Sequence, residues 1–114
     1  MFKITDRSGY HPFARPGDED EGIWLDHAEV HLVTHPVGQV KEVHTHDPPQ
    51  DHIIMIRSGR MRWTVEGQTL DAEPGDVVIT PAGVAHSYEV LGEEPAKVVC
   101  IDSPPLPKPP GNEA

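Results

Sequence analysis

Helical periodicity is missing from this sequence. No window of ten or more residues repeats apolar side chains at the spacing of one helix face. Short runs rich in β-branched and aromatic residues recur instead, and turn signals separate them. Thirteen prolines and ten glycines in 114 residues suit many turns and oppose long helices. The pattern predicts an all-β domain.

About seven or eight short strands are expected, one roughly every ten residues, as in a β-sandwich or barrel. Glu66-Gly67 is expected to form a hairpin turn, and Pro74-Gly75 carries a type II turn signal. The clearest strand-like runs are residues 29–35, 51–59, 60–70, 76–81, 85–92 and 96–102. The apolar core is expected to contain Ile54, Ile56, Met61, Trp63 and Val78.

Charge and cysteine content narrow the possible partners and the compartment. Lys and Arg total 9 and Asp and Glu total 19, a formal net charge of -10. This charge repels phosphate backbones and anionic lipids, so we expect neither nucleic acid nor a membrane as partner. No run approaches the roughly 20 apolar residues of a membrane span, and the N-terminus lacks a signal-peptide core. The single cysteine, Cys100, excludes an intrachain disulfide, and we expect a cytoplasmic protein.

Both ends of the chain differ from the strand-rich middle. Pro16–Gly22 is highly charged and is expected to be a solvated loop. Residues 104–114 contain five prolines and are expected to form a flexible, polyproline-like tail. The predicted organisation is a single domain over residues 1–103 followed by this tail.

Three histidines, His44, His46 and His52, lie within nine positions. On a strand, residues two apart point to the same face, so His44 and His46 are expected to form a strand-borne chelate for a metal ion. Pro48-Pro49 stiffens the loop that leads to His52. A fourth histidine, His86, follows a second turn-rich segment forty residues after His46.

These segments resemble the two motifs of the cupin family. Gly38, His44, His46 and the approach to Gly59 resemble the first motif. Gly75, Pro81, Gly83 and His86 resemble the second, except that Val90 stands at its final asparagine. The motifs cover residues 38–90. The resemblance implies a double-stranded β-helix, or jelly-roll barrel, with one divalent transition metal per chain inside it (Fe, Mn, Ni, Cu or Zn), and a homodimer paired through edge strands.

The fourth ligand departs from the family pattern of three histidines and a glutamate. Counting back from Gly59 places His52 at the glutamate position, whereas counting from His46 favours Gln50 or Asp51. We favour His52, because a rigid strand leads to Gly59 and loops absorb length changes. The predicted ligands are His44, His46, His52 and His86, with Asp51 as the alternative fourth.

The remaining candidates line the site or assist in it. Tyr88 shares the strand face of His86, and the pocket lining is expected to include Ile54, Trp63, Tyr88 and Cys100. Candidates for acid–base work are Tyr88, Asp51 and His31. A solvent-facing or hydrogen-bonded role is expected for His31, and His11 and His27 are expected in loops.

Four neutral imidazoles leave the full charge of the ion available, so the site favours anionic or enolisable oxygen ligands. The leading hypothesis is a metalloenzyme acting on a small organic molecule, with dioxygenase chemistry ahead of isomerase or lyase chemistry. The alternative is a cupin that binds or senses a small molecule without turning it over.

Overall fold

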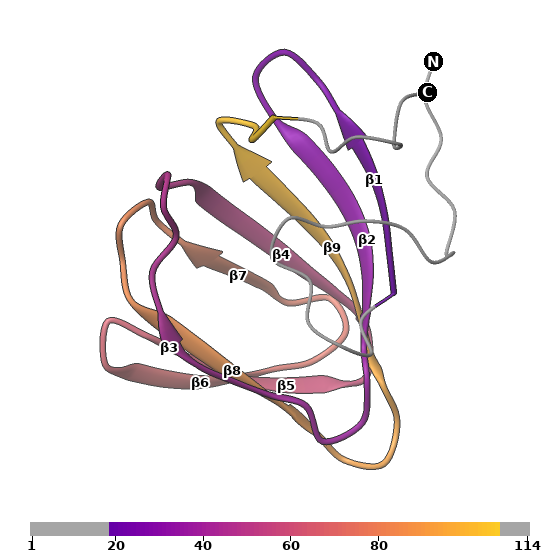
Figure 1. Ribbon diagram of the computed structural model, residues 1–114. Helices are drawn as coiled ribbons and strands as arrows, with labels where there is room; N and C mark the ends of the chain where they lie inside the picture. Colours follow the sequence, from indigo (N-terminus) through magenta and orange to yellow (C-terminus); the bar gives the residue numbers. More distant parts are fainter. Residues whose placement is uncertain (1–18, 108–114) are drawn as a thin grey trace.

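The computed structural model describes residues 19–107, and within them every regular element is a β-strand. Five strands form one antiparallel sheet in the order β1-β2-β9-β4-β7, and four form a second in the order β3-β8-β5-β6. Figure 1 shows the two sheets facing each other as the walls of a sandwich. The strands are β1 Glu19–Trp24, β2 Glu29–His35, β3 Val40–His44, β4 Asp51–Ser58, β5 Arg60–Val65, β6 Gln68–Ala72, β7 Val77–Thr80, β8 His86–Leu91 and β9 Ala96–Ser103.

This arrangement is the predicted all-β jelly roll. The predicted hairpin between β5 and β6 is present, with Glu66 at φ 50° and Gly67 at φ 77°. Positive φ at both central residues is the conformation that suits a two-residue hairpin. The second predicted turn is followed by β7, which begins two residues after Gly75. Within the described residues, no helix is long and apolar enough to cross a membrane.

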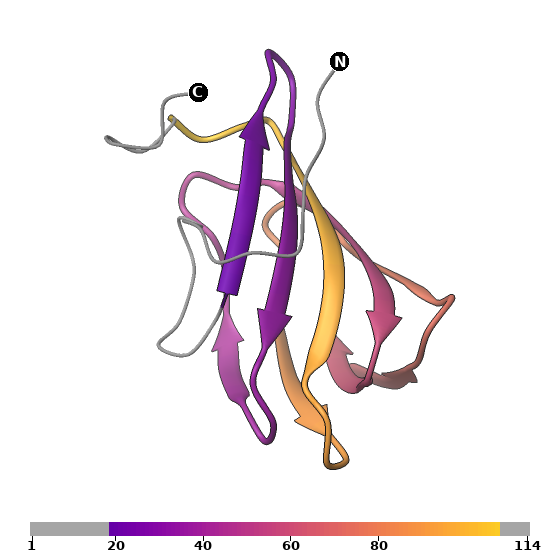
Figure 2. The same cartoon turned by 90° about the vertical axis from the view of Figure 1, so that its right-hand side faces the viewer.

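Two local expectations were wrong. Residues 19–22 of the expected charged loop belong to β1, which pairs antiparallel with β2 along its whole length. The acidic sequence there concealed an edge strand, which Figure 2 shows beside β2 at the margin of the five-stranded sheet, and charged residues are common in edge strands. The chelating pair was expected on one strand, but β3 ends at His44, and His46 lies in the loop that follows.

The core lies between the sheets. All five predicted core residues are buried, with Met61 fully enclosed. Alternate residues of β9 point inward, so this strand contributes Ala96, Val98 and Cys100 from one face. Burial of this apolar surface is the main stabilising contribution, about 25 cal/mol for each Å² removed from water. The remaining core members are Val33, Ala72, Tyr88 and Val90.

Gly59 is required where β4 turns into β5. Its φ is +77°, and a Cβ there would lie 2.4 Å from the carbonyl oxygen of Pro95. Both features exclude a side chain. This turn fixes the end of β4, the strand that carries His52.

The start of the proline-rich segment contacts the folded domain. The Pro104 carbonyl accepts a hydrogen bond of 2.7 Å from Gln50 Nε2, and the Leu106 N–H donates to Glu29 Oε2 at 2.5 Å. Residues 104–106 are therefore held against β2 and the loop before β4. The rest of the predicted tail, from residue 108, lies outside the described residues, as does His11. His27 lies in the exposed loop between β1 and β2, as expected.

Candidate metal centre

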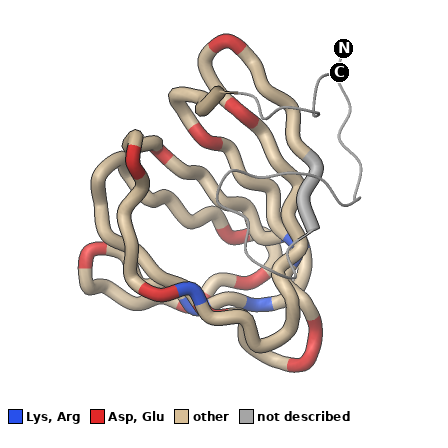
Figure 3. Tube along the Cα trace, viewed as in Figure 1, with Lys and Arg blue, Asp and Glu red and all other residues tan. Residues whose placement is uncertain are grey.

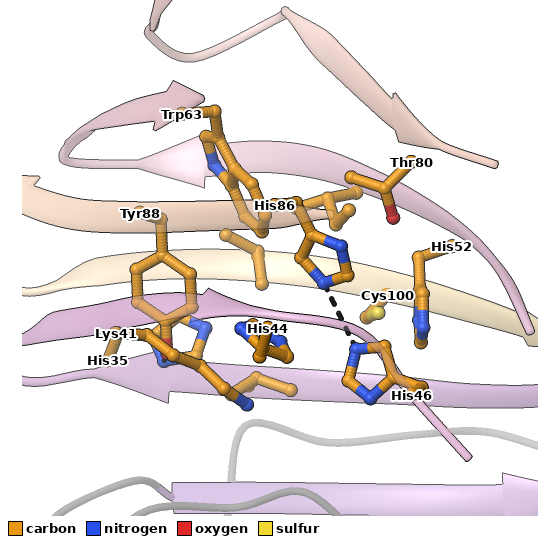
Figure 4. Close-up of a pocket in the computed structure, with 13 residues that line it drawn as sticks. His35, Lys41, His44, His46, His52, Trp63, Thr80, His86, Tyr88 and Cys100 are labelled. Carbon is orange, nitrogen blue, oxygen red and sulfur yellow. Dashed lines mark hydrogen bonds between the residues drawn. The ribbon is translucent and has the colours of Figure 1, made fainter. Parts of the chain in front are cut away.

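A cavity of about 70 Å³ lies between the two sheets, and histidines form one end of it. Figure 4 shows the imidazoles of His44, His46, His52 and His86 gathered there, with Trp63 and Tyr88 along the wall. Both sheets contribute to the lining, so the site exists only in the folded sandwich. The lining residues are Val33, His35, Lys41, His44, His46, His52, Ile54, Trp63, Thr80, His86, Tyr88, Val98 and Cys100.

His44 and His86 face each other across paired strands. They are direct partners in the β3–β8 register, and their ring centroids are 4.2 Å apart. His44 Nδ1 donates to the Glu42 carbonyl at 2.8 Å, and His86 Nδ1 donates to the Val84 carbonyl at 2.9 Å. A carbonyl oxygen only accepts, so both protons must reside on Nδ1. Each ring therefore keeps a lone pair on Nε2.

His46 joins this pair from the loop after β3. Its Nε2 lies 3.0 Å from Nε2 of His86. Two ligands at a right angle on one ion, with bonds of about 2.1 Å, would stand about 3.0 Å apart. One nitrogen from each of His44, His46 and His86 lies within 4.8 Å of the others. The three donor atoms are therefore close enough together to form a candidate metal site.

His52 approaches the cluster from the opposite sheet, although its donor atoms group within 4.8 Å with those of Cys100 and Asp102 rather than with those of all three other histidines. Its ring centroid is 4.4 Å from that of His46 and 5.9 Å from that of His86. Its Nδ1 donates to Asp102 Oδ1 at 2.5 Å, which leaves the lone pair on Nε2. That Nε2 is buried and has no hydrogen-bond partner among the described residues. A buried polar atom without a partner is destabilising, and a metal ion would satisfy it.

The two competing candidates for the fourth ligand lie elsewhere. Asp51 is exposed, and its Oδ1 accepts from the Ala82 N–H at 2.8 Å, which braces the turn before His86. Gln50 is buried, and its amide nitrogen donates to Glu29 at 3.1 Å and to Pro104. Neither lines the cavity, whereas His52 does.

The electrostatic setting favours the neutral form of His44, His46 and His86. Burial lowers the pKa of His44 from 6.5 to about 4 and that of His46 to about 3. The neighbouring histidines and Lys41 lower both pKa values further, while the bond to Glu42 partly opposes the shift at His44. Burial also lowers the pKa of His86, against the opposing effect of its bond to Val84. Neutral imidazole is the form that binds a metal ion.

The three acid–base candidates differ in whether they line the cavity. Tyr88 lines the cavity, and its hydroxyl donates to Gln39 Oε1 at 3.0 Å and lies 3.3 Å from His35 Nδ1. His31 is fully buried rather than solvent-facing, does not line the cavity, and lies 2.8 Å from Glu29 Oε1. Asp51 is also outside the cavity. The four residues expected to line the pocket, Ile54, Trp63, Tyr88 and Cys100, all do so.

Sequence reasoning missed several residues of this region. Glu29 and Asp102 are fully buried acids behind the site, and Lys41 and Thr80 line it. A signal for Asp102 was present, because it stands two residues after Cys100 on an alternating strand. Glu29, His31 and Val33 lie on the inward face of β2. The outward face also carries apolar residues, so the sequence did not show which face points inward.

Comparison with known proteins agrees with this architecture. A profile of the Cupin domain family matches residues 31–102, well over half of the chain. The chain belongs to the cupin family. Members of this family bind small-molecule substrates and commonly hold a metal, and the histidine-rich groups here could hold one.

Individual similarities are more distant. The chain is 30% identical over 70 residues to the uncharacterized protein MJ1618 of Methanocaldococcus jannaschii, and 39% identical over 56 residues to the uncharacterized protein SCO3923 of Streptomyces coelicolor. These matches cover 61% and 49% of this cupin and 55% and 52% of the two relatives, so the chain spans about half of their length. The solved structure of KdgF from Halomonas sp. superposes with a TM-score of 0.74 at 21% identity, covering 93% of this chain and 89% of that one. At that identity the likeness concerns the fold.

Proposed function

We propose that this cupin is a metal-dependent enzyme acting on a small anionic or enolisable organic molecule. The metal ligands are the Nε2 atoms of His44, His46, His52 and His86. The observation that carries the proposal is the buried Nε2 of His52, which lacks a hydrogen-bond partner among the described residues and belongs to a ring packed against the other histidines. When bound, a divalent ion would supply Lewis acidity or redox chemistry at this point.

The chain's own residues define what happens around that ion. Carbonyl groups and the Asp102 carboxylate fix the tautomers of three rings, so their donor atoms are oriented before any ion arrives. Apolar side chains such as Ile54 and Trp63 restrict water in the cavity. Tyr88 is the candidate acid–base residue that lines it.

Dioxygenase chemistry remains the preferred reaction type. Isomerases and lyases depend on a positioned acid or base beside the substrate. Two of the three acid–base candidates, His31 and Asp51, do not line the cavity. Chemistry centred on the metal therefore fits this pocket better than chemistry centred on proton transfer. Binding or sensing without turnover is the alternative function.

The test is metal analysis of the purified protein together with substrate screening under air and under nitrogen. We expect about one transition metal per chain. His86→Ala should lose most of it while circular dichroism still shows a β-sheet protein, because the apolar core does not include the ion. His52→Ala should also lose metal and Asp51→Ala should retain it. The reverse result would replace His52 by a carboxylate, and turnover that needs no oxygen would favour a lyase or isomerase.

A further inference from the structure

We propose that the ammonium group of Lys41 binds the carboxylate of the substrate, so the substrate is a small carboxylic acid with a second oxygen donor near its acid group. This proposal rests on the proposed function and specifies its substrate class. It assigns Lys41 as the specificity-determining residue of the site.

A strand irregularity aims Lys41 into the pocket. Lys41 pairs with Tyr88 and His44 pairs with His86, and the β3–β8 register shifts between the two pairs. Residues three apart on a regular strand face opposite sides, yet both Lys41 and His44 line the cavity. Irregularities of this kind re-aim side chains and are common beside functional sites. Figure 4 shows Lys41 running past His35 and Tyr88 toward the histidine cluster.

Lys41 brings a positive charge to the cavity lining. Among the described residues that line the cavity, Lys41 is the one Lys or Arg and none is Asp or Glu. Figure 3 shows acidic positions distributed over the loops and few basic ones, in keeping with the net charge of -10. Lys41 and the four histidines line the same cavity, which places its charge beside the candidate metal ligands. An anion therefore meets local attraction in this cavity on an otherwise repelling molecule.

The cavity volume limits the size of the acid. About 70 Å³ accommodates a compact ligand. An acid held by Lys41 at one end and by the histidine-bound ion at the other needs two oxygen groups close together. Short 2-hydroxy and 2-oxo acids have this form. The fully buried Thr80 hydroxyl has no hydrogen-bond partner among the described residues and lines the same cavity, so it offers a further polar contact.

The test compares lactate with lactamide, which has a similar shape and no charge, by titration calorimetry on metal-loaded protein. Wild type should prefer lactate about tenfold or more, and Lys41→Met should lower lactate affinity about tenfold while lactamide affinity changes little. Metal content should not change. Methionine keeps the apolar stem of the lysine side chain. Lys41→Arg should retain the preference for lactate over lactamide. Lys97→Met on β9, outside the cavity, is the matched control.

Two outcomes would overturn the Lys41 assignment alone: no preference for lactate in metal-loaded wild type, or unchanged lactate affinity in Lys41→Met. Failure of wild type to hold a metal would be seen before any ligand is added, and would overturn the proposed function instead.

Discussion

Asp102→Asn tests how the chain prepares His52 for a metal ion. The Asp102 carboxylate is fully buried and accepts from His52 Nδ1 at 2.5 Å. Cys100 Sγ also donates to the same oxygen, at 3.0 Å. Asparagine has nearly the same shape, but its amide group can donate to Nδ1. A proton on Nε2 of His52 would then occupy the donor atom that the ion needs.

The expected effect follows from the role of such outer partners. Loss of a hydrogen-bonded carboxylate behind a ligating histidine lowers metal affinity by about 10- to 100-fold, or about 1.4 to 2.7 kcal/mol. We expect the upper half of this range, because His52 is nine-tenths or more buried and the short bond leaves little room for another orientation.

The assay is competition between the protein and a fluorescent chelator, with urea unfolding of the metal-free protein alongside. Asp51→Asn is the matched control, since Asp51 bonds to the Ala82 N–H outside the cavity. Affinity in Asp102→Asn within twofold of wild type, with folding intact, would refute the argument. His31 also lies 3.9 Å from Asp102, so some loss of stability is expected in either case.

Four further outcomes are expected. Metal-free protein should lose stability as the pH falls from about 6.5 toward 5.5, because the pKa values of His44 and His46 are about 4 and 3 and the unfolded chain therefore binds more protons in this window. Urea unfolding at the two pH values measures this, and equal midpoints would contradict it. The protein should release its bound metal only at a pH below about 6, which is the value expected for histidines with unperturbed pKa values. Gly59→Ala should lower the free energy of unfolding by about 2–4 kcal/mol, because Gly59 has a positive φ and the new Cβ would contact Pro95. Gly67→Ala should lower it by about 1 kcal/mol, because a Cβ there would meet nothing within 4 Å. Similar thermal midpoints for the two variants would contradict this expectation. Deleting residues 105–114 should leave metal content unchanged and lower stability by about 1 kcal/mol, because the Leu106 N–H bond to Glu29 is lost. Deletion from residue 108 preserves that bond, and metal loss in either deletion would show that the segment supports the site.

Local features of the sequence predicted much of the fold. Proline and glycine positions marked the turns, and the β5–β6 hairpin formed where Glu66-Gly67 indicated it. Alternation within β5 identified buried residues such as Met61 and Trp63, since one face of that strand is clearly more apolar. The spacing of the histidines in two motifs also identified the family, because the strands and turns between them have fixed lengths.

Alternation did not reveal which face of β2 points into the core. Both of its faces carry apolar residues, so the pattern alone could not place His31 inside. Burial of Glu29 and His31 depends on β9, where Asp102 and Cys100 stand opposite them in the register. The polar partners in this part of the core come from strands far apart in sequence.

The orientation of the site was decided by tertiary structure. Asp102 meets His52 across fifty residues of sequence, since β4 and β9 are neighbours in the sheet. The irregular register of β3 turns Lys41 inward, although regular alternation places it opposite His44. Sequence determined which side chains were available as ligands. The pairing of distant strands determined which nitrogen each ring presents and what charge stands beside it, because strand register and burial are properties of the assembled sheets.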